Sequence, residues 1–262
     1  MRLALILLCC EGVAAWAQIG SSWTPPAPQL QWTFGVQRSQ PTITSNVQGS
    51  RGGKASLVDT DADLGLTRES SPLAAFLEYK TGDHGFRLAY DTSRFQGQRT
   101  LGRDILLNGI SYASGDLVRS TAKLTVLEGL YTYKFVNQPD AWVGLDLGIQ
   151  QLKSDLSATD LTVPALPQSS TPTLTLPQIG ISGWSSGVDG LLESNLFLHY
   201  FTHRGATWYR YGLDGRAYLY PHFGLRAFYE AGRIKIPAGS TQGGLDFRMD
   251  AKVFGAGLVF RF

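Results

Sequence analysis

Apolar and polar side chains alternate along many stretches of this chain, and beyond its first residues no apolar run is long. In the last ten residues, VFGAGLVFRF, the large apolar residues Phe254, Leu258, Phe260 and Phe262 fall on even positions, whereas the charged Arg261 falls on an odd one. A period of two is typical of an extended strand with one apolar face. No run after the first residues approaches the ~20 apolar residues of a spanning helix. The pattern therefore predicts an all-β chain.

The first residues are organised like a secretory signal. Arg2 precedes an apolar run over residues 3–10, and the small residues Ala15 and Ala17 follow it. The run is too short to cross a bilayer as a helix, and no stop-transfer pattern comes after it. We therefore expect residues 1–17 to be a signal peptide and residues 18–262 to form a single exported domain.

Both cysteines, Cys9 and Cys10, lie inside the expected signal peptide, so the exported domain would carry no disulfide. A lipoprotein acylated at one of them is the alternative, but the residues before each lack the small side chain that such processing needs. A disulfide-free exported domain must be held by its own core or by a sheet closed on itself. Charges are nearly balanced, 23 Lys and Arg against 21 Asp and Glu, which argues against nucleic acid as a partner.

Strand-like segments bounded by Gly, Pro, Asn or Asp recur throughout the exported domain and sum to about ten antiparallel strands, with eight as the nearest alternative. Their connections alternate in length, apart from a brief turn near residues 202–205. Short turns are expected at 82–85, 136–140, 189–190 and 220–222, and long connections at 39–71, 95–116, 153–177 and 236–244. Short turns on one side and long loops on the other are typical of a closed antiparallel transmembrane β-barrel, which we place in residues 28–262.

Alternation alone does not say whether the apolar face points inward or outward. A soluble lipocalin-like ligand-binding barrel is the alternative, and it would place Trp32, Phe34, Leu88 and Leu145 inside. Three features favour lipid on the outside: export without cysteine, the sorted connections, and Tyr and Trp residues near strand ends, where the interfacial girdles of membrane barrels lie.

The final strand, GAGLVFRF, resembles the closing strand of Gram-negative outer-membrane β-barrel proteins. In that family the last residue is typically Phe, preceded by apolar residues at alternating positions, and the barrel assembly machinery reads the pattern. The resemblance implies that Phe262, Phe260 and Leu258 form the assembly signature and face lipid, with Arg261 turned inward. It also implies outer-membrane lipid as a partner, together with the assembly machinery and periplasmic chaperones during biogenesis.

Further back in the same strand, charged residues occupy the even positions that apolar residues hold near Phe262. They are Lys252, Asp250, Arg248 and Asp246. Either the strand leaves the membrane at this point or a β-bulge switches its faces.

If the apolar parity faces lipid, charged residues of the opposite parity point into the lumen. This set comprises Glu78, Arg87, Asp91, Asp146, Glu193, Arg210, Asp214, Arg216, Arg226 and Glu230. Mixed signs in a narrow interior predict ion pairs that fill it, because an unpaired charge away from water costs several kcal/mol. A polar core is favoured over a selective channel, since a barrel of this size has little room for a wide pore.

The four histidines provide no convincing catalytic constellation. His199 and His203 share a strand face and permit a zinc or acid–base interpretation, but His84 and His222 lie in short turns. No Ser follows a His by two residues, as it does in the lipid A deacylase barrels, and the GDHG turn lacks the Asp-x-His spacing of omptin-like proteases. We expect no catalytic residue, no metal site and no cofactor.

Two connections have unusual compositions. DTDADLG at residues 59–65 begins like an EF-hand loop, but Leu64 stands where the sharp turn needs Gly and Ser70 where a bidentate Glu is needed. A solvated acidic loop is favoured there over a loose divalent site among Asp59, Asp61 and Asp63. Residues 161–178 hold four prolines and no charge, which is typical of a lid or contact surface rather than of strand throughout.

The sequence thus predicts an integral outer-membrane β-barrel protein with a structural, surface-contact or porin-like small-solute role. An outer-membrane hydrolase acting on lipid A or peptides is the runner-up. That class of enzyme would gather His, Ser or acidic side chains at one rim of the barrel.

Replacing Phe262 with Ser is expected to impair assembly in cells, because the terminal aromatic side chain would be lost from the recognised strand. The measurement is the amount of folded protein in the outer-membrane fraction of cells that express each form. Normal insertion of the variant would mean that Phe262 is not part of the recognition signal.

Overall fold

The computed structural model describes residues 32–51, 54–68, 73–107, 110–162, 168–170, 173–203, 205–237 and 246–262. The expected signal peptide at 1–17 lies outside these ranges. The strands are β1 (Trp32–Arg51), β2 (Lys54–Asp59), β3 (Thr67–Arg68), β4 (Leu73–Thr81), β5 (His84–Thr100), β6 (Ile105–Leu107), β7 (Ile110–Tyr112), β8 (Leu117–Asn137), β9 (Ala141–Asp160), β10 (Gln168–Ser170), β11 (Thr173–Gly187), β12 (Leu192–His203), β13 (Ala206–Tyr220), β14 (Phe223–Ile236) and β15 (Asp246–Arg261). The described residues form no helix, and hence none long and apolar enough to cross a membrane.

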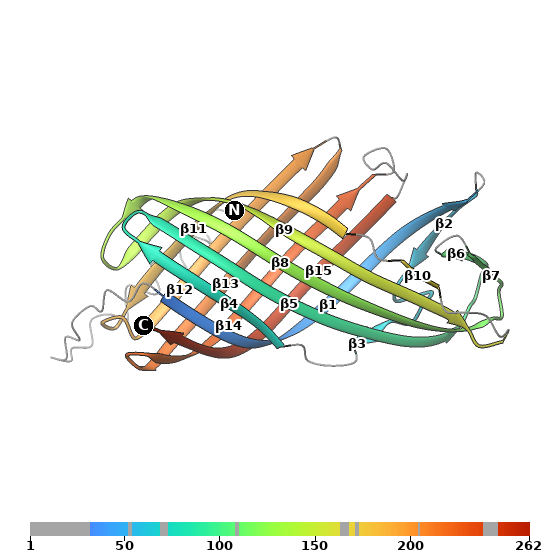
Figure 1. The fold of residues 1–262 in the computed structure, drawn as a ribbon, viewed down its shortest axis with the longest axis horizontal. Coiled ribbons are helices and arrows are strands. Elements are labelled where there is room, and N and C mark those ends of the chain that lie inside the picture. The colour runs from blue at the N-terminus through green and yellow to red at the C-terminus, as the bar shows by residue number, and fades with distance from the viewer. Residues whose placement is uncertain are drawn as a thin grey trace, which may run out of the picture.

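Ten of these strands close into an antiparallel barrel (Figure 1). Their order around the barrel is β1, β4, β5, β8, β9, β11, β12, β13, β14 and β15. The ring closes where β15 pairs with β1, and there Trp32 and Phe262 exchange two backbone hydrogen bonds of 3.0 Å. The predicted barrel of about ten strands is confirmed, and the eight-stranded alternative is wrong.

The apolar side chains that alternate along each strand lie on the outer surface of the barrel. Trp32, Phe34, Leu88 and Leu145 are 37% to 59% exposed, which is the inverse of what a soluble ligand-binding barrel requires. Further exposed apolar side chains are Phe86, Leu127, Phe135, Val143, Leu147, Ile149, Ile179, Ile181, Leu196, Leu198, Leu213, Leu219, Leu225, Phe254 and Leu258. They form the apolar band that a barrel in a bilayer presents to lipid.

Strand β15 shows where this band ends. Its pairing with β1 and β14 continues to the start of the strand without a register shift, so no bulge switches its faces. Phe254 is exposed on the outer face, and Lys252 and Arg248 are exposed on the same face further from the C-terminus. The strand therefore leaves the apolar band between Phe254 and Lys252.

Three of the expected long connections are partly strand. β1 continues to Arg51 and pairs with β2, β5 extends to Thr100 against β8, and β9 extends to Asp160 while β11 begins at Thr173. The interpretation of residues 39–71, 95–116 and 153–177 as loops is wrong over these parts. The outward side chains become polar beyond the apolar band, as at Arg94 and Lys123, although the hydrogen-bonded ladder continues.

Two strand prolines lie where a neighbouring strand has ended. The backbone of Trp32 hydrogen-bonds to that of Phe262, so the N–H and C=O groups of even-numbered β1 residues point toward β15. Those of odd-numbered residues point toward β4, and this is the side on which Pro41 lacks its N–H. The pairing of β1 with β4 ends at Arg38, before Pro41. By the same parity argument, Pro177 in β11 lacks its N–H on the side of β12, and that pairing begins only at residue 179. Neither proline removes a ladder bond between these strands.

The strand extensions beyond the band carry a small core of their own. It consists of Val58, Leu64, Leu101, Ile105, Leu107, Tyr112, Val118, Leu156 and Ala158. These residues come from β2, β6 and β7, from the adjoining turns and from the inner faces of β8 and β9. Strands β2, β6 and β7 and the segments around Leu64 and Leu101 are therefore packed against the extended β8–β9 sheet, at the end of the barrel opposite the C-terminus (Figure 1).

Replacing Leu147 with Arg is expected to destabilise the folded barrel by about 2–4 kcal/mol, because the charge would lie within the apolar band. Gln151→Arg, two outward positions further along β9, is the matched control and should cost about 0–1 kcal/mol. Unfolding by urea in lipid vesicles measures both. Equal costs for the two variants would contradict the assignment of the outer face to lipid.

Candidate functional site

Ten charged side chains form one continuous series of ion pairs inside the barrel. The guanidiniums belong to Arg87, Arg210, Arg216, Arg226 and Arg261, and the carboxylates to Glu78, Glu128, Glu193, Asp214 and Glu230. Nine contacts of at most 3.9 Å join them without a break. The five positive and five negative charges balance, and contacts between opposite strands cross-link the lumen.

The tightest part of this network lies between β4, β13 and β14. Arg216 donates from Nη1 and Nη2 to the two carboxylate oxygens of Glu78, both at 2.8 Å, and from Nη2 to Asp214 at 3.0 Å. Arg226 donates from Nε to the other oxygen of Asp214 at 2.9 Å. All four side chains are buried. Bidentate, charge-assisted bonds of this kind are the arrangement that offsets the desolvation of buried charges.

The ring of Phe76 lies among the guanidiniums. Its centroid is 4.6 Å from the guanidinium carbon of Arg226, 5.1 Å from that of Arg87 and 5.3 Å from that of Arg216. Gly35 of the neighbouring β1 makes room for the ring, since a Cβ there would lie only 2.1 Å from a Phe76 ring carbon. The ring fills the lumen at a point where cation–π contacts are available.

Glu128 of β8 links the two halves of the series. Its carboxylate pairs with Arg210 from across the lumen and lies 3.7 Å from Nε of Arg87, which also contacts Glu78 at 3.3 Å. Gln178 donates to the same carboxylate at 3.3 Å. Glu128 is only 3% exposed, so it acts as a buried junction.

A second buried group lies beside this junction. His199 and Asp146 are 2.9 Å apart, from Nε2 to Oδ2, and Thr132 and Ser182 donate to the other oxygen of Asp146 at 2.6 and 2.9 Å. Arg210 donates to Nδ1 of His199 at 3.5 Å, which leaves Nε2 to donate to Asp146. The imidazole thus has a partner at each nitrogen.

This group does not have the order of a nucleophile, base and orienting acid. The hydroxyl of Ser182 bonds to the carboxylate, whereas a catalytic triad places it against the imidazole. His199 is 1% exposed. His84 bonds to Tyr131, and His222 bonds to the carbonyl oxygen of Arg261, both at the end with the short turns.

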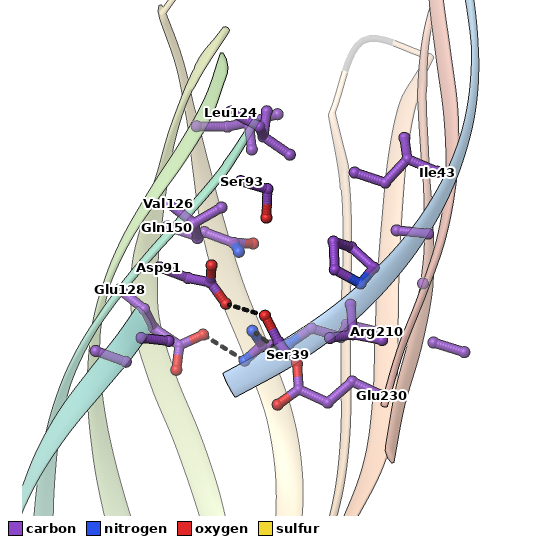
Figure 2. Close-up of a pocket in the computed structure, with 18 of the residues that line it drawn as sticks. Ser39, Ile43, Asp91, Ser93, Leu124, Val126, Glu128, Gln150, Arg210 and Glu230 are labelled. Atoms are coloured by element: carbon purple, nitrogen blue, oxygen red, sulfur yellow. Dashed lines mark hydrogen bonds and ion pairs between the residues drawn. The ribbon is translucent and has the colours of Figure 1, made fainter. Parts of the chain in front are cut away.

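A cavity of about 150 Å³ lies where the ion-pair series ends (Figure 2). Its charged lining residues are Asp91, Glu128, Glu230, Arg87, Arg210 and Arg233. Apolar side chains complete the wall, among them Ile43, Leu124, Val126, Leu152, Trp208 and Met249. The lumen is therefore polar in one part and largely apolar in the next.

The structure places every predicted lumen residue on the inner face. Glu78, Arg87, Glu193, Arg210, Asp214, Arg216, Arg226 and Glu230 belong to the ion-pair series, Asp146 bonds to His199, and Asp91 accepts from Ser39 at 3.3 Å. Sequence reasoning missed Glu128 because Leu124, Val126 and Leu130 share its parity and hide the polar face of β8. Thr132 and Lys134 are polar residues of the same strand that share the parity of Glu128. They could have indicated that Glu128 points into the lumen.

The three residues of the expected assembly signature lie on the outer face of the closing strand. Leu258, Phe260 and Phe262 are 43%, 37% and 57% exposed. Arg261 points inward, pairs with Glu193 at 3.1 Å and lies 3.8 Å from the ring centroid of Tyr218. The last strand thus exposes its apolar side chains and anchors its charge inside.

The acidic segment at 59–63 uses its carboxylates to hold its own turn. Asp59 accepts from the backbone N–H groups of Asp61 and Ala62 at 2.9 and 2.8 Å, and Asp63 accepts from Arg103. Partial burial raises the pKa of Asp63, but the hydrogen bonds from Arg103 and from the backbone of Asp59 outweigh it and lower that pKa below its ordinary value. Arg103 thus ties this turn to the segment that precedes β6.

Solved structures resemble the chain in fold, whereas no protein-family model and no curated protein matches its sequence. The outer membrane protease OmpT from Escherichia coli aligns with 93% of this chain and 99% of its own, at 12% identity and a TM-score of 0.56. The translocator domain of the autotransporter NalP from Neisseria meningitidis covers 100% and 96% at 9% identity and a TM-score of 0.44. The β domain of the Bordetella autotransporter BrkA covers 89% and 99% at 14% identity and a TM-score of 0.45.

Replacing Glu78 with Gln is expected to destabilise the barrel by about 3–5 kcal/mol, because Arg216 would lose its buried bidentate partner. Asp250→Asn is the matched control: it removes one carboxylate from an exposed pair with Arg233 and should change stability little. Unfolding by urea in lipid vesicles compares the two variants. Equal stability of both would mean that the inner network does not hold the barrel together.

Proposed function

This chain folds as an outer-membrane β-barrel of ten strands, and from that premise we propose that it is an integral outer-membrane protein with a structural and surface-contact role. Its lumen is closed to solutes. It is not an enzyme. The observation that carries this proposal is the unbroken ion-pair series across the lumen.

The outer surface supports insertion in the membrane. Large side chains such as Leu88, Ile149, Ile181 and Phe254 are more than half exposed and lie in one band. A band of this kind is unfavourable in water and suits a hydrocarbon surround. Export through residues 1–17, and delivery to the assembly machinery by periplasmic chaperones, complete the proposed route.

The inner network supports a closed lumen. Arg210 and Arg216 reach from β13 to Glu128 on β8 and to Glu78 on β4, across the interior. Phe76 fills space between the guanidiniums. A solute passing through would have to separate buried, hydrogen-bonded pairs, and breaking one such pair costs about 3–5 kcal/mol.

The region beyond the apolar band supports a contact role. Strands β5, β8 and β9 continue past the band, and β2, β6 and β7 pack against them through a core that includes Leu64, Ile105 and Val118. A packed extension holds its outward side chains in fixed positions, whereas a solvated loop does not. A rigid surface of this kind is suited to contact with lipid headgroups or with another macromolecule.

Three of the four histidines support a non-enzymatic role. His199 is buried with both nitrogens engaged, and His84 and His222 have partners at the end with the short turns. OmpT is a protease by its name, but the likeness to it at 12% identity concerns the fold. A hydrolase is therefore not proposed for this chain.

Conductance in planar lipid bilayers tests the closed lumen. We expect no steady single-channel step from the native protein, because the ion pairs block the interior. A triple variant with Gly in place of Glu78, Arg87 and Arg216 is the matched control and should conduct if it remains folded. Steady steps from the native protein would overturn the proposal.

A further inference from the structure

We propose that the outer surface of the barrel binds phosphorylated lipid headgroups at one edge of the apolar band, on the side of the long connections. The inference rests on the proposed membrane location and adds to it the chemistry of the lipid that contacts this edge. Six exposed cations, which we call the basic belt, form the site: Arg38, Arg94, Lys123, Lys153, Arg233 and Lys252.

The basic belt lies directly beyond the apolar band. On β15, Lys252 is the next outward residue after Phe254, and on β5, Arg94 is two outward positions beyond Tyr90. On each of the six strands that supply the belt, its cation is the first charged outward residue past the band. Successive outward residues are about 7 Å apart along a strand, and the headgroup layer is roughly 5–8 Å thick on each side of the hydrocarbon. Because long Arg and Lys side chains extend this reach, the belt lies at the depth of lipid headgroups.

The belt follows one continuous arc of the barrel wall. Strands β14, β15, β1, β4, β5, β8 and β9 are neighbours in the ring, and all except β4 contribute a cation (Figure 1). β4 begins at Leu73, opposite Arg38, so it ends at the level of the belt. The described outward residues of β11, β12 and β13 past the band carry no charge. The arc therefore presents a one-sided positive surface to the surrounding lipid.

Two cations of the belt are directly opposite each other. Arg94 and Lys123 are partners in the β5–β8 register, and both point outward. Directly opposite side chains have Cβ atoms about 5 Å apart, and two like charges there destabilise a sheet. One carboxylate, Asp155 of β9, is opposite Lys123 and balances one of these two charges at most. An anion held between the two cations removes the repulsion, and guanidinium and ammonium groups are donors that bind phosphate.

Ion pairs within the protein leave most of the belt available. The two ion pairs that the described residues form outside the lumen are those of Arg233 with Asp250 and of Arg103 with Asp63. The other five cations of the belt therefore have no described carboxylate within 4.0 Å. Their charges are free to contact phosphate groups of the lipid.

The opposite edge of the apolar band has the reverse character. Its short turns carry Asp83, Asp140 and Asp189, and among the described residues no Arg or Lys points outward beside them. Long connections lie on the outer side of such barrels, so the belt faces the outer leaflet. Anionic headgroups attract basic residues near a membrane surface, and the belt therefore selects a leaflet rich in phosphate.

Three probes test the proposal: lipid A with two phosphates, lipid A with one phosphate, and inorganic phosphate. Each is titrated calorimetrically into the folded full chain in micelles of a neutral detergent, and the heat of titration into detergent alone is subtracted. We expect the diphosphoryl form to bind about fivefold more tightly than the monophosphoryl form, as one further cation–phosphate contact near a membrane surface predicts. Inorganic phosphate should not bind at the same concentration. Equal affinity for the two lipids, equal binding of inorganic phosphate, or no binding of any probe would overturn the proposal.

Arg94→Gln removes one cation of the belt. Arg119→Gln makes the same change two outward positions beyond Lys123 on β8, further from the apolar band, and is the matched control. Diphosphoryl lipid A should bind about fivefold more weakly to the first variant and within about twofold of its native affinity to the second. Heat-dependent gel mobility shows whether each variant is folded, and Lys153→Gln replaces Arg94→Gln if the latter is not. Equal weakening by both variants would mean that net charge, rather than the belt, attracts the lipid, and the site would be wrong.

Arg94→Gln should also change stability in opposite directions in two kinds of vesicle. In phosphatidylcholine alone the loss of repulsion with Lys123 should leave the urea midpoint unchanged or raise it. In phosphatidylcholine that contains diphosphoryl lipid A the midpoint should fall below that of the native chain, because a stabilising lipid contact is lost. Shifts of the same sign and size in both vesicles would contradict the proposal. Failure of the native chain to insert in either vesicle would overturn the membrane location as well, whereas loss of the phosphate preference alone overturns only this inference.

Discussion

The structure depends on the closure of its backbone hydrogen bonds. In hydrocarbon an unpaired N–H or C=O costs several kcal/mol, so a sheet crosses a membrane only when its last strand returns to its first. Here β15 returns to β1, and Trp32 and Phe262 complete the seam. The prolines at 41 and 177 are compatible with this because each lacks its N–H where the pairing with β4 or β12 has stopped.

Closure forces a second problem, because the inward side chains must fill a narrow lumen. In one part the chain fills it with charge, and the cost of burying Arg216 and Glu78 is offset by bidentate geometry and by further partners on each side. In the next part it uses Leu152, Trp208 and their apolar neighbours. The proposed closure of the lumen and the apolar part of the cavity both follow from this change along one axis.

The alternation of apolar and polar residues predicted much of the inner face of the barrel. The parity that placed Arg87, Asp146 and Arg226 inside needs only the two-residue period and one decision about which face meets lipid. The strand extensions were misread because polar residues beyond the band look like loop residues. Glu128 was missed because apolar neighbours occupy the lumen side of its strand, where a simple inside–outside rule expects polar ones.

The sequence by itself determined the all-β class, the approximate number of strands and which side chains share a face of most strands, because these follow from local periodicity and turn residues. Only the tertiary structure decided which charges meet. Arg216 and Glu78 are 138 positions apart, and no local pattern relates them. Their contact, the junction at Glu128 and the cavity beside it arise when strands distant in sequence face one another across a closed ring, since the geometry of that ring is a property of all ten strands together.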